Sequence, residues 1–130
     1  MINTAQEEYV ELLNLLKELA IQGGFTLAVL TDQNGLPIAS SDSDQEISET
    51  QAAVVAQIQS VILRAVRHLS MSSPDEVVLS DADGRKLVCR EFAAGDRTVF
   101  YLAILIPNRK LAYRKLMNRA IRSMQATWKI

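Results

Sequence analysis

The sequence predicts an α+β domain whose elements follow the order helix, two strands, helix, three strands, helix. Segments with helical apolar spacing occupy both ends and the middle of the chain. Runs rich in apolar and β-branched residues lie between them, and glycine-containing turns join these runs into antiparallel neighbours. The simplest packing of these elements is one five-stranded antiparallel sheet, with the terminal helices on one face and the central helix on the other.

The first third of the chain predicts a helix and a hairpin. A helix is expected from Thr4 to Gly23, because a capping box begins it and Gly23-Gly24 ends it. Two strands follow in the segment FTLAVLTDQNGLPIAS, joined by the turn Asp32-Gln33-Asn34-Gly35. Pro37 has no N–H to donate, so its strand is expected at a sheet edge or a bulge.

The central helix, expected from Ile47 to Leu69 with Ser48 as its N-cap, has apolar residues on two faces. The main face is expected to pack on the sheet and contains Ile47, Val54, Ile58, Val61, Ile62, Ala65 and Leu69. The second face is expected to meet another chain and contains Ala52, Ala56 and Leu63, beside Val55, Gln59 and Val66. This pattern predicts a domain that associates.

The last third predicts three strands and a basic helix. Strands are expected at Glu76 to Ser80, Arg85 to Phe92 and Thr98 to Ile106, the last one covered on both faces. The final helix, expected from Asn108 with Pro107 in its first turn, includes Trp128 in its buried stripe. It contains seven cations and no Asp or Glu, a pattern interpreted as a solvated face beside the acidic first helix.

Composition indicates a single domain over residues 1–130. The net charge of −1 gives no general attraction to nucleic acid or membranes, so neither partner is expected. Cys89 is the only cysteine, which excludes an internal disulfide and favours a cytoplasmic location. No apolar run reaches the length of about 18 residues that a membrane span requires.

The residues predict no enzyme, catalytic site, metal site or cofactor. His68 is the only histidine and is expected at the surface near a helix end, and Cys89 is expected to be a buried structural thiol. Asp81-Ala82-Asp83-Gly84 resembles the start of a calcium loop, but Phe92 stands where that loop needs Glu, so a turn is expected. No phosphate-binding glycine motif occurs.

The hairpin FTLAVLTDQNGLPIAS, the long helix, VVLSDADGRKLVCREF, TVFYLAILI and the final helix together resemble the roadblock/LC7 family. The resemblance implies a non-enzymatic homodimer or heterodimer formed through the central helix and the first strand after it. Some members of the family bind and regulate small Ras-like GTPases, others are dynein light chains or lysosomal scaffolds, and the leading hypothesis is a homodimer with a small Ras-like GTPase as partner. The dimer interface would contain Ala52, Ala56, Gln59, Leu63, Val66, Val77 and Leu79. Arg64, Arg67 and His68 would border it and contact the partner.

Two alternatives remain open at this stage. PAS- and GAF-like sensor domains also combine a five- or six-stranded antiparallel sheet with helices, and such a sensor would need an apolar pocket with a few convergent polar groups. Nucleic-acid binding through the basic last helix would show a steep dependence of affinity on salt.

Overall fold

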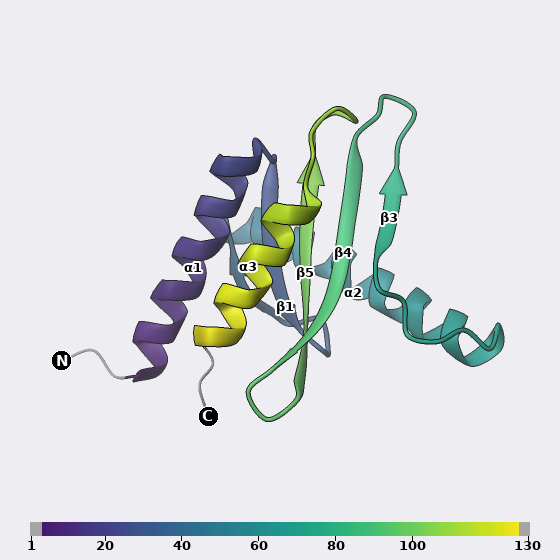
Figure 1. Cartoon of the computed structure of the whole chain (residues 1–130), viewed down its shortest axis with the longest axis horizontal. Coiled ribbons are helices and arrows are strands. Elements are labelled where there is room, and N and C mark those ends of the chain that lie inside the picture. Colours follow the sequence, from purple (N-terminus) through teal and green to yellow (C-terminus); the bar gives the residue numbers. More distant parts are fainter. Residues whose placement is uncertain (1–3, 128–130) are drawn as a thin grey trace.

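The computed structural model describes residues 4–127, which form three helices and five strands in the predicted order (Figure 1). The elements are α1 (Thr4–Gly23), β1 (Leu27–Asp32), β2 (Pro37–Ser40), α2 (Gln45–His68), β3 (Val77–Ser80), β4 (Lys86–Ala94), β5 (Thr98–Ile106) and α3 (Arg114–Thr127).

The strands form one antiparallel sheet in the order β2-β1-β5-β4-β3. β5 lies at the centre of the sheet, and most of its side chains are buried. This was predicted because the residues on both of its faces are apolar. α1 and α3 lie side by side on one face of the sheet and α2 crosses the other (Figure 1). The predicted α+β layer arrangement is confirmed.

The turn between β1 and β2 forms where the sequence predicted it. The Asp32 carboxylate oxygen Oδ1 accepts hydrogen bonds from the N–H groups of Asn34 (2.8 Å) and Leu36 (2.9 Å). Gly35 has a φ of 83°, a conformation that glycine adopts without steric cost. Pro37 begins the edge strand β2, next to a register shift in its pairing with β1.

The sheet has a hydrophobic core on each face. The larger one joins the sheet to α1 and α3, and its fully buried members include Leu16, Leu30, Leu102, Ile104, Met117 and Met124. A smaller core beneath α2 joins Val55 and Ile62 to Cys89, Tyr101 and Ala103. The alternation along β4 is as predicted, because Val88 and Phe92 belong to the first core and Cys89 to the second.

Two helix starts differ from the prediction. α2 begins at Gln45, three residues before the expected cap Ser48, because the Asp44 side chain accepts a hydrogen bond from the Ile47 N–H and caps it. α3 begins at Arg114 rather than Asn108, so Pro107 lies outside the helix.

The segment before α3 is held in another conformation by side-chain contacts. Asn108 Oδ1 accepts a hydrogen bond from the Lys110 N–H (3.0 Å), and the Tyr113 hydroxyl donates to Glu76 (3.0 Å). The bond to Asn108 uses the Lys110 N–H locally and so competes with helix formation in this segment. Trp128, expected in the buried stripe of this helix, lies outside the described residues.

Cys89 is buried, with 3% of its surface exposed, as predicted for a structural thiol. Burial raises the pKa of the Cys89 thiol from its ordinary value to about 12, because the charged thiolate would lose its hydration. The folded thiol is therefore protonated, and thus inert, at neutral pH.

Stability is expected to fall at alkaline pH because of this thiol. The unfolded-state thiol ionises near pH 9, so the contribution of Cys89 is fully present below that pH and is lost as the pH rises towards about 12. The free energy of unfolding, measured in urea between about pH 8 and 11, is expected to decrease with a slope that Cys89→Ala reduces. An unchanged slope would show that other groups, such as Tyr101 with its raised pKa, dominate alkaline unfolding.

Candidate interaction surface on the central helix

One face of α2 packs on the sheet and contains the buried residues Ala52, Val55, Gln59 and Ile62. The Gln59 side-chain amide donates hydrogen bonds to Thr31 Oγ1 (3.2 Å) and to the Asp32 carbonyl oxygen (3.3 Å), which joins the helix to the first hairpin. Beside it, the turn residue Gly35 lies against Ala56 so closely that an added Cβ would approach the Ala56 Cβ within 2.3 Å. Small residues therefore allow α2 to lie directly on the hairpin turn.

The prediction of which α2 face packs on the sheet is wrong in part: Ile62 and Ile58 pack beneath the helix and Leu63 is exposed, as expected, but other members of the two sets are exchanged. Ala52 and Gln59, expected to meet another chain, are 1% and 4% exposed within the protomer, so a second chain has no access to them. Ile47, Val54 and Val61, expected beneath the helix, are instead exposed. The periodicity gave the angle between the two apolar faces, but only close packing against the hairpin selects the one that is buried.

Exposed apolar side chains gather on α2 and on the neighbouring strand. Near the C-terminal end of α2 they are Val61 and Leu63, on either side of the helix, and Leu69 just after it. On β3, Leu79 is on the sheet face that α2 covers and Val78 is on the opposite face. We call this set the α2–β3 surface. Figure 1 shows the reason for its exposure, because the C-terminal turns of α2 extend past β3, where no strand of the sheet lies beneath them. Exposed apolar patches of this kind are typical of association sites.

β3 is an edge strand, so one side of its backbone has no neighbouring strand. Hydrogen bonding in an antiparallel pair alternates between residues. Since the Asp81 N–H donates to the Arg85 carbonyl oxygen, the alternate residues Ser80 and Val78 direct their backbone groups away from β4. Unpaired backbone groups on an apolar strand are a template for pairing with another chain.

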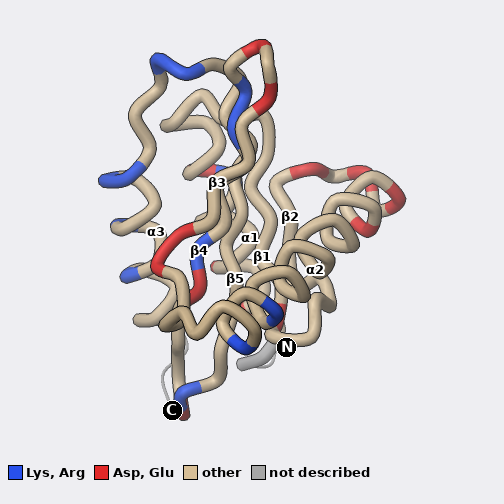
Figure 2. Tube along the Cα trace, turned by 90° about the vertical axis from the view of Figure 1, so that its right-hand side faces the viewer, with Lys and Arg blue, Asp and Glu red and all other residues tan. Residues whose placement is uncertain are grey.

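The polar residues expected near this surface are exposed as well. Arg64, Arg67 and His68 lie in the last turns of α2, and within residues 4–127 neither arginine takes part in an ion pair. Figure 2 shows basic residues near this end of α2 and a group of acidic residues at the connection from β2 to its start. Val66 and Val77, expected in the dimer interface, are half-buried, and Ala56 is half-buried against Gly35.

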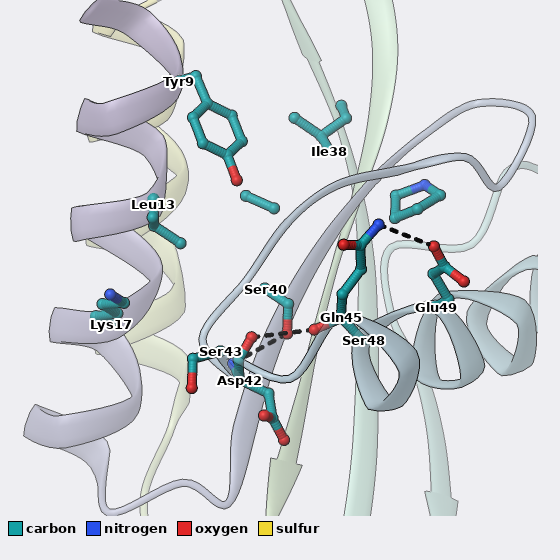
Figure 3. Close-up of a pocket in the computed structure, with 12 residues that line it drawn as sticks. Tyr9, Leu13, Lys17, Ile38, Ser40, Asp42, Ser43, Gln45, Ser48 and Glu49 are labelled. Atoms are coloured by element: carbon teal, nitrogen blue, oxygen red, sulfur yellow. Dashed lines mark hydrogen bonds between the residues drawn. The ribbon is translucent and has the colours of Figure 1, made fainter. Parts of the chain in front are cut away.

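A separate groove lies beside the other edge strand (Figure 3). It has a volume of about 500 Å³ and is open to the surface. Tyr9, Leu13 and Lys17 of α1 form one wall and β2 forms the floor. The other wall contains Gln45 and Glu49, which are hydrogen-bonded to each other (3.3 Å). Sequence analysis did not identify this groove, because its walls come from elements distant in the chain.

The residues considered for chemistry occupy structural positions. Asp81 forms a turn, since its Oδ1 accepts hydrogen bonds from the N–H groups of Asp83 (3.0 Å) and Arg85 (2.8 Å). The described residues include no group of three or more His, Cys, Asp or Glu side chains placed to hold a metal ion. In the same part of the chain, no helix has both the length and the apolar character needed to cross a membrane.

A sheet between two helical layers, with exposed apolar residues beside a free strand edge, is an arrangement typical of domains that bind other protein chains. A family model described as the Roadblock/LC7 domain matches residues 11–92, more than half of the chain. The chain therefore belongs to the roadblock/LC7 family, as the resemblance indicated. Membership in this family supports the role of a regulatory scaffold.

Solved structures share this fold at low sequence identity. Myxococcus xanthus MglB is 17% identical with a TM-score of 0.75, and the match covers 97% of this chain and 91% of that one. The gliding protein mglB of Thermus thermophilus is 17% identical with a TM-score of 0.71 (93% and 90% covered). A roadblock/LC7 domain from Streptomyces avermitilis is 21% identical with a TM-score of 0.68 (88% and 92% covered). No curated protein matches the chain.

Proposed function

We propose that this protein is a dimeric, non-enzymatic adaptor that binds a small Ras-like GTPase and changes its nucleotide cycle. The observation that supports it most directly is the α2–β3 surface. Pairing of two β3 edges would extend the sheet across both copies, and the overhanging end of each α2 would then cover apolar residues of the partner. Leu63 and Leu79, both more than half exposed, would be buried in this dimer.

The GTPase is proposed to contact the end of α2 that bears Arg64, Arg67 and His68. These side chains are exposed beside apolar Val61 and Leu69, which gives a surface with both charge and apolar area. A two-fold dimer would present this surface twice. The family resemblance supplies the class of partner, and the basic side chains supply its proposed contact.

A binding assay with purified small Ras-like GTPases from the same genome, loaded with GDP or GTP, tests this function. One of them is expected to co-elute with the protein and to change its hydrolysis or exchange rate by at least about tenfold. The double substitution Arg64→Glu/Arg67→Glu is expected to abolish both effects. Lys110→Glu, which reverses an exposed charge in the segment before α3, is the control and should leave them unchanged. Absence of co-elution and of any rate change across the GTPases would refute the proposal.

The alternative of a small-molecule sensor has one supporting observation, the groove beside β2. Its lining mixes apolar side chains with carboxylates and the Lys17 amine, and it is open along one side, whereas ligand pockets are usually concave and largely apolar. Native mass spectrometry of the purified protein would favour this alternative if a copurified small molecule were found and were lost in Tyr9→Ala.

A further inference from the structure

α1 and α3 lie antiparallel on the face opposite α2, and their outward sides bear opposite charges (Figure 1). The exposed acidic residues of α1 include Glu7, Glu11 and Glu18, and the exposed basic residues of α3 include Lys115, Arg119 and Arg122. The outer side of this layer therefore has one acidic and one basic stripe, parallel to each other. We call it the two-stripe face.

The two stripes do not neutralise each other within the protomer. In the described part of the chain, ion pairs join Arg85 to Asp81 and Asp83, and Arg114 to Glu76, but none joins α1 to α3. Glu18 and Arg119 line the same shallow groove of about 100 Å³ at the seam between the helices without forming an ion pair. Both stripes are therefore available to a partner.

Apolar side chains are also uncovered on this face. Val10 and Ile21 of α1 are 49% and 80% exposed. Leu15 and Leu116 are half-buried and line the groove at the seam. Docking of a partner would remove this apolar surface from water in addition to pairing charges.

The arrangement of the charges restricts the kind of partner. A uniformly anionic surface, such as a membrane or a nucleic acid, would attract α3 but repel the neighbouring α1 glutamates. A favourable partner must present two stripes of opposite sign in reversed order. A second copy of this chain, related by a two-fold axis parallel to the helices, does so, because its α1 then faces α3 and its α3 faces α1.

We infer that the two-stripe face is a second self-association surface, on which α1 of one copy pairs with α3 of another. This contact is separate from the α2–β3 surface, so it does not depend on the proposed function. Where both contacts form, dimers join into tetramers; where only one forms, the chain is a dimer.

The size of the face predicts a weak contact. α3 has 14 residues, which corresponds to a length of about 21 Å, and two adjacent helices are about 20 Å wide. The buried area is then about 800 Å² in total, below the range of stable interfaces. Association is therefore expected at high protein concentration, and it should weaken with salt because exposed charges contribute to it.

Sedimentation equilibrium of the full chain over a wide concentration range tests the inference. The association constant of this contact is expected to fall by about tenfold or more between about 50 mM and 300 mM NaCl. Arg119→Glu/Arg122→Glu makes both stripes acidic and should abolish the contact. Glu11→Arg/Glu18→Arg makes both stripes basic and should abolish it too. An equimolar mixture of the two variants should restore association, because each face then meets its opposite.

Two controls separate this contact from others. Arg109→Glu/Lys110→Glu makes the same change in net charge in the segment before α3, outside the two-stripe face, and should leave the salt-sensitive association unchanged. Val61→Glu, within the α2–β3 surface, should also leave the salt-sensitive association through the two-stripe face intact. The inference is overturned if the mixture does not associate, or if self-association is insensitive to salt and to both reversals. Binding of wild-type protein to phosphatidylserine vesicles, with no salt-sensitive self-association, would also overturn it.

Discussion

Gly35→Ala is expected to lower the free energy of unfolding by about 2–5 kcal/mol, through backbone strain and overpacking together. Gly35 has a φ of 83°, which a residue with a Cβ adopts at a steric cost. The new Cβ would also lie 2.3 Å from the Ala56 Cβ and 3.1 Å from its Cα. Neither atom can rotate away, so the hairpin turn must move off α2. Urea unfolding followed by circular dichroism measures the loss.

Gly24→Ala is the matched control for this prediction. Gly24 also has a positive φ, 67°, but the nearest atom to its added Cβ is Leu111 Cδ1 at 3.7 Å, an ordinary contact. Only the strain of about 1–2 kcal/mol is then expected. Equal losses at the two glycines would show that the contact with α2 contributes nothing. In the double variant Gly35→Ala/Ala56→Gly, which removes the opposing Cβ, the loss should be smaller than the sum of the single effects.

Val61→Glu is expected to convert the proposed dimer into a monomer. Val61 is 62% exposed in the protomer, so a carboxylate there leaves the fold intact, whereas in the dimer it would be an unpaired charge in an apolar contact. Light scattering at low protein concentration and about 300 mM NaCl, where contacts between exposed charges are screened, should give a mass near 14.4 kDa for the variant. The wild type should give twice that mass. Ser60→Glu, at the exposed neighbouring position, is the control and should remain dimeric.

A second variant tests the strand edge separately. Val78→Pro removes an N–H that is directed away from β4, so pairing within the protomer should be retained while pairing with another β3 is prevented. Monomers from both Val61→Glu and Val78→Pro would place the interface on the α2–β3 surface. Dimers that survive both substitutions would exclude this surface, and the wild-type mass would then have to come from another contact.

The sequence by itself determined the elements and their layers, because their signals are local. The turn at Asp32 to Gly35 depends on a carboxylate and a nearby glycine, and β5 depends on an unbroken apolar run. Element order and hairpins then leave few ways to place three helices on one sheet. The family followed from the same signals, and exposure of Arg64, Arg67 and His68 agreed with their expected polar position.

Only the tertiary structure decided the orientation of α2, the start of α3 and the neighbour of β1. The face with more Ile and Val is not the one that is most buried, so the choice depends on contacts distant in sequence: Ala56 against Gly35, and Gln59 bonded to Thr31. Just before α3, the Tyr113 hydroxyl donates to Glu76, 37 residues away in the chain. Pairing of β1 with β5 is likewise non-local. Periodicity gives the angles between residues along one element, but the direction in which that element faces is fixed by the rest of the core.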